Sequence, residues 1–426
     1  MAKRVALGLA LCLVIALTAQ AAISAIDSKK KAELYKQVEL FSDSLAIVET
    51  EYVDEPEPRN LIYGALKGMI SSLDPHSQFL DPDSYNELKI DTEGKFGGIG
   101  IEITIKDGIL TVVTPIDDTP AWKAGLKSGD GIVKINDELT RDMTLTEAVR
   151  RLRGKPGEVV NITVLRDSEK KLLEFKIVRA IIKIKDIKEA RILQDRIGYI
   201  RLVEFRENTP QDMDIAMGKL KKEGMNALIL DLRNNPGGLL DIAVRVAEKF
   251  IEKGNLIIST KGRKPSSDMK FISRCKEPIL DLPMAVLINE GSASGSEIVA
   301  AALKDYKRAI VLGTKSFGKG SVQTLIPLSD GSALRLTTAR YFTPSGKEIH
   351  NKGVEPDIVV ENPKPETEGA GGEAAKDNKA AEALEKPEKP LQKEKFDYKS
   401  DNQIMRAIDI LKAVRHYKKD SQEAAS

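Results

Sequence analysis

Two short segments of this sequence offer a serine hydroxyl and a lysine amine to one reaction. Residues 291–297 read Gly-Ser-Ala-Ser-Gly-Ser-Glu and lie between an apolar strand-like stretch (284–288) and a helix-like one (298–303). Residues 313–323 read Gly-Thr-Lys-Ser-Phe-Gly-Lys-Gly-Ser-Val-Gln, a glycine-rich turn that contains Lys319. A serine oxygen is a poor nucleophile while it is protonated, so it needs a base beside it. The pairing predicts a serine hydrolase in which a lysine acts as the base.

The lysine can act as that base only if its surroundings disfavour the ammonium form. An exposed lysine has a pKa of about 10.4 and stays charged at neutral pH. Burial penalises the charged form and can lower the pKa by several units. We therefore expect Lys319 to lie in a partly apolar pocket with its amine on the hydroxyl of Ser294. Gln323 could orient the amine by accepting a hydrogen bond, as the third member does in other triads.

The lysine segment also nearly matches a phosphate-binding loop. Gly313, Gly318 and Lys319 fit the pattern G-x-x-x-x-G-K. The next residue should be Ser or Thr, to hold magnesium, and a helix should begin there. Gly320 stands in that place, and the residues after it read as a strand. The pattern therefore disfavours nucleotide binding.

Other residues with reactive side chains are weaker alternatives. Of the three histidines, only His350, after the turn at 343–346, is a credible rival base for Ser294. Cys275 could be a thiol nucleophile, but no apolar strand or small-residue turn frames it. No cluster of His, Cys and Asp has the spacing of metal ligands, so we expect no metal and no other cofactor.

A third segment, Asp231-Leu-Arg-Asn-Asn-Pro-Gly-Gly238, ends a predicted strand and opens a predicted helix. Backbone amides at the N-terminus of a helix point toward whatever binds there. A purely structural strand-to-helix turn is the alternative, above all for Arg233 and Asn234.

Strands and helices alternate through residues 185–360, which favours a layered α/β domain. The strand candidates are 197–202, 227–232, 256–259, 285–288 and 309–312, with helices at 211–222, 239–251 and 296–305 and extended pieces at 322–327 and 332–341.

The segment before residue 90 is expected to be largely helical from residue 28 onward. A helix over 60–73 should stop before Asp74-Pro75, because the residue before proline resists helical geometry. An earlier helix carries an apolar stripe that is either a partner surface or packs on the next domain. The stripe consists of Leu34, Val38, Phe41, Leu45 and Val48, at spacings of three and four residues.

Residues 94–180 change in character. Gly97-Gly98-Ile99-Gly100 leads into a strand with isoleucine at alternate positions, and Ala124-Gly-Leu-x-Ser-Gly-Asp130 follows. Thr144 should cap a helix, and 159–166 with 171–178 should form a strand pair. This block resembles a PDZ domain of the kind found in bacterial proteases. Such domains take up an extended peptide as an added strand and hold its terminal carboxylate on a glycine loop.

The PDZ resemblance implies that Gly97, Gly98, Ile99 and Gly100 bind the C-terminus of a substrate. Arg153 could bridge this domain to substrate or to the catalytic domain; a solvated surface arginine is the alternative.

The serine and lysine segments resemble those of the carboxyl-terminal processing peptidases, also called tail-specific proteases. In that family the middle serine of a Ser-Ala-Ser-Ala-Ser-Glu-like run attacks, and the lysine of a Gly-Thr-x-Ser-x-Gly-Lys-Gly-x-x-Gln run is the base. Matched onto this sequence, the catalytic residues are Ser294, Lys319 and Gln323. The family's oxyanion hole implies the backbone amides of Gly238 and Gly295. Gly295 stands where the family commonly has alanine, which we expect to loosen the turn.

The family resemblance covers about residues 35–360, including the similar Leu73-Asp-Pro-His-Ser77 segment. It implies an exported serine endopeptidase that cleaves proteins near their C-termini, with a crotonase-like α/β core, an inserted PDZ domain and a helical N-terminal segment, in class an α/β (α+β multidomain) protein. The implied partners are protein or peptide substrates with free C-termini, a homo-oligomer through the helical termini, and an adaptor or regulator protein. A non-catalytic PDZ adaptor that binds protein C-termini is the alternative, which the joint presence of serine, lysine and glutamine disfavours.

Bulk composition and the first residues bear on location. The 426 residues suggest two or three domains, and a net charge of +2 gives no reason to expect nucleic acid. Lys3 and Arg4 precede an apolar run at 5–19 and the small-residue site Ala19-Gln20-Ala21, the pattern of an export signal. We expect a periplasmic or cell-envelope protein. The alternative is an uncleaved amino-terminal tether to the inner membrane.

The expected organisation follows from these observations. A segment of low complexity, poor in residues that could be buried, precedes a last helix at 402–417 with Ile404, Ile408, Leu411 and Val414 on one face. The expected parts are a signal peptide (1–25), a helical N-terminal segment (28–92), a PDZ domain (93–180), a serine peptidase core (181–361), a disordered low-complexity segment (362–398) and a C-terminal helix (399–426).

Overall fold

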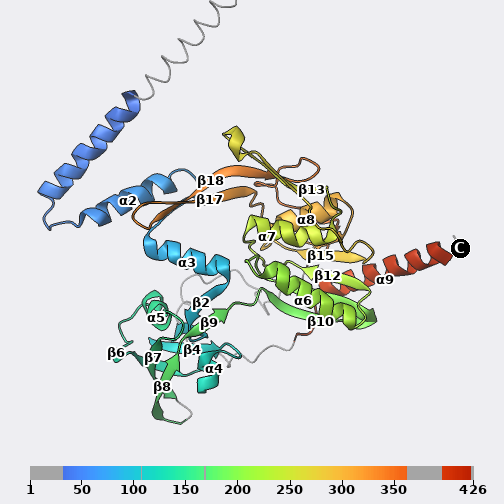
Figure 1. Cartoon of the computed structure of the whole chain (residues 1–426), viewed down its shortest axis with the longest axis horizontal. Coiled ribbons are helices and arrows are strands. Elements are labelled where there is room, and N and C mark those ends of the chain that lie inside the picture. Colours follow the sequence, from blue (N-terminus) through green and yellow to red (C-terminus); the bar gives the residue numbers. More distant parts are fainter. Residues whose placement is uncertain (1–31, 107, 167–168, 362–395, 424–426) are drawn as a thin grey trace, which may run out of the picture. The chain divides into compact units, whose positions relative to one another are not determined.

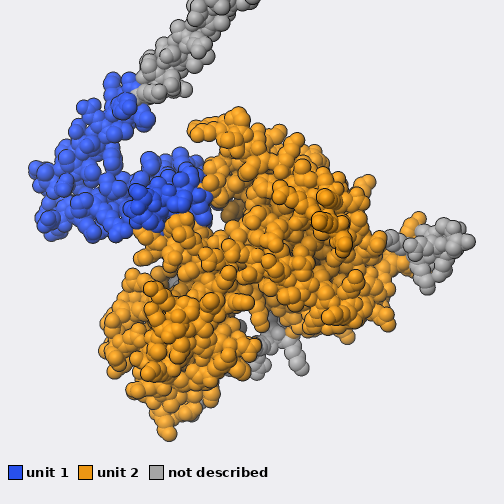
Figure 2. Space-filling view, viewed as in Figure 1, with its two compact units in different colours: residues 1–81, 325–336 blue, residues 82–324, 337–426 orange. Residues whose placement is uncertain are grey.

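A computed structural model of the chain describes residues 32–106, 108–166, 169–361 and 396–423. The expected export signal lies outside these residues, as does all but the end of the low-complexity segment. Among the helices that are described, none is both long enough and apolar enough to cross a bilayer. The chain divides into two compact units (Figure 2), which are Met1–Asp81 with Leu325–Leu336, and Pro82–Thr324 with Thr337–Ser426.

The first unit begins with a helix at residues 32–51, as expected. Its apolar stripe is solvent-accessible: the exposed fraction is 64% at Leu34, 54% at Val38, 47% at Phe41 and 40% at Val48. Such a stripe on a surface helix is the kind of patch that marks a contact with a partner.

A second helix and a short strand complete this unit. Helix α2 (Pro58–Ser71) starts on proline, whose missing N–H would be unpaired in a first turn anyway, and ends before Asp74 as expected. The carboxylate of Asp74 accepts hydrogen bonds from the amides of His76 and Ser77, which turns the chain into β1 (Gln78–Leu80). β1 pairs antiparallel with the start of β18, at Ala333–Arg335.

The second unit opens with a small domain that has its own sheet. The sheet runs in the order β3-β4-β5-β7-β8, with β6 on β5, and a separate ribbon joins β2 to β9. Its elements are α3 (Pro82–Glu93), β2 (Lys95–Gly98), β3 (Ile101–Lys106), β4 (Ile109–Pro115), α4 (Pro120–Ala124), β5 (Gly131–Ile135), β6 (Glu138–Leu139), α5 (Leu145–Leu152), β7 (Val159–Arg166), β8 (Lys171–Val178) and β9 (Ala180–Lys183).

Local sequence signals explain several of these elements. Thr144 caps α5 by accepting a hydrogen bond from the amide of Glu147, as its position in the sequence predicts. Helix α4 ends at Gly125 in the left-handed conformation (φ 86°) that glycine adopts most readily. Along β7, alternate residues Val160, Ile162 and Val164 are buried in the core of this domain.

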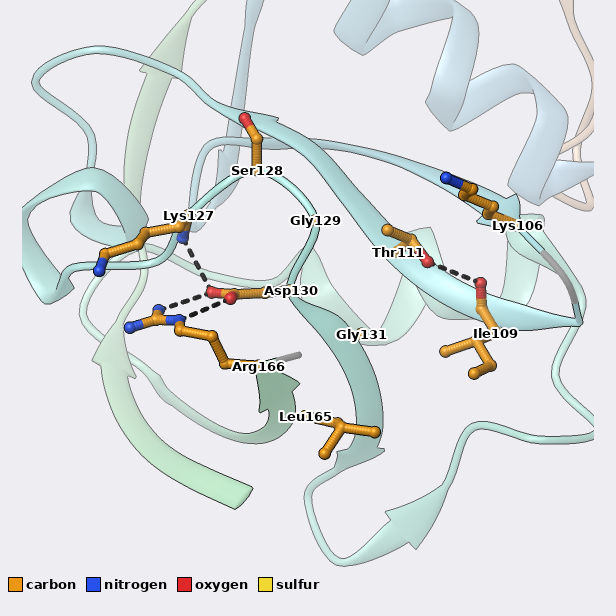
Figure 3. A pocket seen from close by; sticks show the side chains of 10 residues that line it. All are labelled: Lys106, Ile109, Thr111, Lys127, Ser128, Gly129, Asp130, Gly131, Leu165 and Arg166. Carbon is orange, nitrogen blue, oxygen red and sulfur yellow. Dashed lines mark hydrogen bonds and ion pairs between the residues drawn. The ribbon is translucent and has the colours of Figure 1, made fainter. Parts of the chain in front are cut away.

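A buried ion pair holds one turn of this domain in place. The Arg166 guanidinium lies 2.7 Å from the Asp130 carboxylate, which is 1% exposed and also accepts the backbone N–H of Lys127 (Figure 3). The ion pair fixes the turn before β5 to the end of β7. A pocket of about 350 Å³ beside it is lined by residues such as Lys106 and Thr111, and by none of residues 97–100.

The larger part of the second unit is built on a six-stranded sheet with the order β10-β11-β12-β15-β16-β19. Within this sheet β11, β12, β15, β16 and β19 pair in parallel, and β10 pairs antiparallel with β11 at one edge. Its elements are β10 (Ile187–Ile192), the 3-10 turn η1 (Gln194–Arg196), β11 (Ile197–Leu202), α6 (Thr209–Lys222), β12 (Ala227–Asp231), α7 (Leu240–Ala247), η2 (Glu248–Phe250), β15 (Met284–Ile288), α8 (Gly295–Asp305), β16 (Ile310–Gly313), β19 (Ile358–Val359) and α9 (Asn402–Glu423).

Helices cover both faces of this sheet (Figure 1). On β12, Leu228 and Leu230 pack with side chains of α6, α7 and α8, whereas Ala227 and Ile229 pack with α9. Every residue of β12 and β15 is therefore buried, as in parallel sheets with two covered faces. The expected α/β class is confirmed.

The last helix packs through the face that the sequence indicates. Ile404, Ile408 and Leu411 are each 1% exposed or less and lie against the sheet. Their spacing of three and four residues puts them on one side of α9.

A second sheet completes the core. It has the order β1-β18-β13-β14, with β17 on β18. Its remaining elements are β13 (Leu256–Gly262), η3 (Pro265–Ser267), β14 (Met269–Ile272), β17 (Ser321–Pro327) and β18 (Ala333–Phe342).

Arg233 ties the last helix to the end of β12. Its guanidinium lies 2.6 Å from the carboxylate of Asp231, which is fully buried, and 2.9 Å from that of Asp401. It also donates to the side-chain oxygen of Gln403, while the hydroxyl of Tyr199 donates to Asp231. Burial acts to lower the pKa of Arg233, but the hydrogen bonds that Arg233 donates to Asp231 and Asp401, together with the negative charges of these carboxylates, outweigh burial and raise the pKa. These contacts support the alternative in which Arg233 belongs to a purely structural strand-to-helix turn.

Replacing Arg233 by methionine should lower the free energy of unfolding by about 3–5 kcal/mol, because the buried charge of Asp231 loses its partner. Urea denaturation followed by circular dichroism measures the change. The matched control is Arg340→Met, because Arg340 pairs with Glu348 at 3.0 Å while its side chain is 59% exposed. That change should cost about 1 kcal/mol or less. Equal losses in the two variants would contradict a supporting function for the buried pair.

Candidate active site

The three segments singled out by sequence lie at one edge of the six-stranded sheet. β12 ends at Asp231, β15 at Ile288 and β16 at Gly313, and these strands are neighbours. Parallel strands place their carboxyl ends on the same edge, where ligands of α/β sheets bind. The turn after β12, the serine loop after β15 and the lysine loop after β16 therefore converge.

Backbone hydrogen bonds join these loops to one another. The amide of Ala293 donates to the carbonyl of Asn235 at 3.0 Å, and the amide of Phe317 donates to the carbonyl of Ser292 at 3.0 Å. The serine loop is thus bonded to the β12 turn on one side and to the lysine loop on the other.

Ser294 has a strained backbone at the N-terminus of α8. Its dihedrals are φ 50° and ψ −109°, a combination that residues with a side chain rarely adopt. Strain of this kind costs about 1–3 kcal/mol and is found mainly at functional sites. The backbone amide of Ser294 donates to Oε2 of Glu297 at 2.8 Å, and the side chain is half-buried.

Lys319 is half-buried in the turn between β16 and β17. Its backbone amide donates to Oε2 of Glu297 at 2.9 Å, the same oxygen that accepts the amide of Ser294. The backbones of the predicted nucleophile and base therefore meet at one acceptor. The turn is closely packed, because a Cβ on Gly320 would lie 2.2 Å from the backbone nitrogen of His350.

Gln323 lies on β17 and presents an unpaired acceptor. Its Nε2 donates to Oγ of Ser321 at 3.2 Å and to Oγ1 of Thr337 at 2.8 Å. Its Oε1 is buried and has no hydrogen-bond partner among the described residues. A buried carbonyl oxygen without a donor is costly, so this oxygen is suited to accept from an approaching amine.

The backbone amides of Gly238 and Gly295 are the two that the sequence predicts as oxyanion donors. Within the described chain, neither Gly238 nor Gly295 donates its N–H to a protein acceptor. Gly238 has φ 139° and contacts the backbone of Phe205, where a Cβ would lie 2.2 Å from a carbonyl oxygen. Only glycine fits there.

Two residues next to Ser294 were not among the predicted site residues. Gly237 has φ 107°, and a Cβ on it would lie 2.7 Å from the Cβ of Ser294. Tyr341 is 4% exposed, and its amide donates to the carbonyl of Gly320. Burial raises the pKa of Tyr341 to about 12, against the opposing effect of a hydrogen bond with the Ser294 side chain. The only sequence signal for Gly237 was the pair of glycines in which it lies. No local sequence pattern indicated Tyr341.

The alternative sites find less support. A strand and not a helix follows Lys319, unlike a phosphate-binding loop. His350 forms no hydrogen bond with Ser294 in the described chain, and its Nδ1 is buried without a partner. Cys275 is a free, half-buried thiol in the loop after β14. Within the described residues, no three His, Cys, Asp or Glu side chains gather as metal ligands would.

The expected carboxylate loop is partly strand. Gly97 and Gly98 belong to β2 and pair with β9, so that Ile99 and Gly100 alone lie between two strands. Gly100 has φ 79°, and Thr119 fills the space that a Cβ would need. The Arg153 guanidinium lies 4.8 Å from the centre of the Phe96 ring, within the same small domain.

Comparison with known proteins identifies relatives across most of the chain. Residues 196–360 match the model of peptidase family S41, residues 111–166 match a PDZ domain, and residues 14–84 match the N-terminal domain of the activating protease CtpB.

Two curated relatives illustrate the similarity. The carboxy-terminal-processing protease of Bartonella bacilliformis is 47% identical over 345 residues, which is 80% of this chain and 79% of the relative. A "Probable CtpA-like serine protease" of Staphylococcus epidermidis is 35% identical over 342 residues, 80% of this chain and 68% of the relative. Among solved structures, the photosystem II D1 C-terminal processing protease shares 30% identity with a TM-score of 0.44, covering 76% of this chain and 92% of its own.

The strain at Ser294 predicts an unusual order of stability between two substitutions. Glycine adopts the observed backbone conformation without steric cost, whereas alanine keeps the strain. Ser294→Gly should therefore be more stable than Ser294→Ala by about 1 kcal/mol, after allowance for the greater freedom of glycine in the unfolded chain. Thermal unfolding of the two variants measures the difference.

The same pair of substitutions at Ser72 is the control. Ser72 has ordinary dihedrals, φ −73° and ψ −12°, so alanine should be the more stable replacement there. A glycine variant at 294 that is less stable than the alanine variant would show that the backbone is not strained at that residue.

Proposed function

Because this chain belongs to the carboxy-terminal-processing proteases of peptidase family S41, we propose that it cuts its substrates with Ser294 as nucleophile and Lys319 as general base. It is a serine-type peptidase with a PDZ domain. The observation that supports the proposed pair best is the shared acceptor: the amides of both residues donate to Oε2 of Glu297. Two loops so fixed hold their side chains on the same edge of the sheet.

The reaction follows from these positions. The hydroxyl of Ser294 attacks the scissile carbonyl while the neutral amine of Lys319 takes its proton. The negative oxygen that forms accepts hydrogen bonds from the amides of Gly238 and Gly295, each contributing about 3 kcal/mol in the transition state. The ammonium then protonates the departing amine, and an acyl-enzyme remains. Water attacks this ester by the reverse sequence of proton transfers and frees the serine.

Gln323 is proposed to orient the lysine. Its amide nitrogen already donates to two hydroxyls, and its buried oxygen has no donor in the part of the chain that the structure describes. An amine that donates to this oxygen would have its lone pair directed elsewhere, toward the hydroxyl it must deprotonate. This is the orienting function that the third member of a triad performs.

The PDZ domain is proposed to recognise the free C-terminal tails of protein substrates. Gly97 to Gly100 would supply the amides for the terminal carboxylate, and Ile99 and Gly100 lie outside the paired strands. The substrate would then reach the serine with its C-terminal end held. The domain limits at 93–180 and 181–361 remain predictions of the sequence.

Location and assembly are proposed on separate grounds. The charged and apolar start of the sequence supports export to the periplasm or cell envelope, with a cleaved signal or an inner-membrane tether. The exposed apolar stripe of the 32–51 helix supports a homo-oligomer or an adaptor protein as its partner.

Alanine at Ser294 or Lys319 should abolish peptidase activity. We expect kcat for a peptide substrate to fall about 10⁴-fold or more in each variant, because the nucleophile and its base act as a unit. The double variant should have a kcat only slightly lower than that of either single variant. Lys315→Ala, four residues before Lys319 in the same loop but paired with Glu355 and 54% exposed, is the control and should leave kcat unchanged. Wild-type rates in the two alanine variants would refute catalysis here and leave a PDZ adaptor.

Amidation of a substrate's C-terminus should weaken its capture. A peptide acid can accept hydrogen bonds at a glycine loop with a full negative charge, and the amide cannot. We expect KM for the amidated peptide to rise about tenfold with kcat little changed, because about one hydrogen bond to a charged group is lost. Cleavage of both forms with the same KM would remove carboxylate recognition from the proposal.

A further inference from the structure

Glu297 is a buried carboxylate that lies between the serine and lysine loops. It is fully buried on the first turn of α8 and accepts four hydrogen bonds. Its Oε2 accepts the amides of Ser294 (2.8 Å) and Lys319 (2.9 Å), and its Oε1 accepts the amide of Gly318 (2.7 Å) and the hydroxyl of Ser316 (2.5 Å).

These four donors match the charged form of the side chain. An ionised carboxylate has two oxygens with about four acceptor positions and no donor, whereas a protonated acid would turn an O–H toward one of the four donors. Burial of a charge is costly unless hydrogen bonds compensate it. Burial raises the pKa of Glu297, and the hydrogen bonds from Ser316, Gly318, Ser294 and Lys319 oppose that rise.

The pattern goes beyond the capping of a helix. A cap needs only an acceptor for the amides at the start of the helix, which the bond from Ser294 already represents. Three of the four donors come instead from the lysine loop. The hydroxyl of Ser316 also accepts the amide of Val354 at 2.7 Å, which carries the network on to the segment before β19.

The side chain therefore links the serine and lysine loops, in addition to the hydrogen bond from the amide of Phe317 to the carbonyl of Ser292. The amide of Ser294 donates to Oε2 from a strained backbone conformation, and the amide of Lys319 reaches the same atom from the other loop. A change in the position of this oxygen moves both residues. Displacement of about 1 Å between reacting groups can cost a hundredfold in rate.

We propose that Glu297 is a positioning residue that sets the separation between the hydroxyl of Ser294 and the amine of Lys319. The proposal rests on the proposed function of these two residues. Glu297 does not touch the substrate; it acts through the backbone of the nucleophile and of the base.

The test is a comparison of Glu297→Gln and Glu297→Asp with the wild-type enzyme. The glutamine amide has one oxygen in place of two, so its NH₂ group must face either the amides of Ser294 and Lys319 or the amide of Gly318 and the hydroxyl of Ser316. We expect kcat of Glu297→Gln to fall about 100-fold with KM within about threefold, because substrate binding is untouched. The labelling rate of Ser294 by a fluorophosphonate probe should fall in parallel. Aspartate keeps both oxygens but is shorter, so the kcat of Glu297→Asp should lie between that of Glu297→Gln and that of the wild-type enzyme.

A milder variant separates positioning from folding. Ser316→Ala removes one donor from the lysine loop and leaves the three backbone donors in place, so we expect kcat to fall about tenfold. Ser273→Ala removes a buried hydroxyl that donates to the carbonyl of Ile251, outside the three loops. It should lower the melting temperature while kcat stays at the wild-type value. All assays are run well below the melting temperature of each variant.

The outcomes distinguish this inference from the function on which it rests. A kcat within twofold of wild type in both Glu297→Gln and Ser316→Ala overturns the inference, and a fall in melting temperature alone would show a structural cap. If Ser294→Ala and Lys319→Ala are inactive in the same assay, the proposed function survives that result. If those two alanine variants keep their activity, both proposals fail together.

Discussion

Burial of both faces of the six-stranded sheet is the constraint on which the site depends. Every side chain of β12 and β15 is buried, so these strands have no surface on which a reactive group could meet a substrate. The chemistry must then lie where the strands end. Because β12, β15 and β16 run in parallel, their ends share one edge, and three loops with separate sequence signals meet there.

Hydrogen bonding at this edge is satisfied within the protein, with a few exceptions that matter. Asp231 is fully buried but pairs with Arg233 and Tyr199, and Glu297 has four donors. By contrast, the amides of Gly238 and Gly295 and the side-chain oxygen of Gln323 have no partner in the described chain. An unpaired buried polar group in a native structure calls for an explanation, and the proposed reaction offers one for these three groups.

The sequence predicted the parts of the fold whose signals are local. The pair β7 and β8, the cap at Thr144 and the buried face of α9 follow from alternation, capping chemistry and helical spacing. Several strands escaped notice, among them the edge strands β10 and β14, which are half-exposed and mix charged with apolar residues, so that neither shows the apolar run of a buried strand. Contacts between distant residues escaped too. Ser294 and Glu297 have the spacing of a capping box, but neither the three donors that the lysine loop gives to Glu297 nor the approach of Tyr341 to Ser294 leaves a trace in local sequence.

Gly295 shows that the effect of a substitution depends on the residues that pack around it. Glycine in place of the family's alanine suggested a looser turn, yet a Cβ there would lie 3.0 Å from the ring of Phe205 and 3.2 Å from Ala243. Phe205 is fully buried, so its ring is itself packed in the core. In this chain the space that a methyl group would occupy is filled by a neighbouring ring, so the turn is close-packed without a side chain of its own.

The attachment of α9 has a consequence for the order of events during synthesis. Residues 402–411 supply one face of the central sheet, and Asp401 and Gln403 bind the arginine that follows β12. Translation proceeds from the amino end, so the serine and lysine loops leave the ribosome before the helix on which their sheet rests. A nascent chain that already carries both loops still lacks the helix that covers one face of their sheet. The peptidase core is therefore completed only after α9 has emerged.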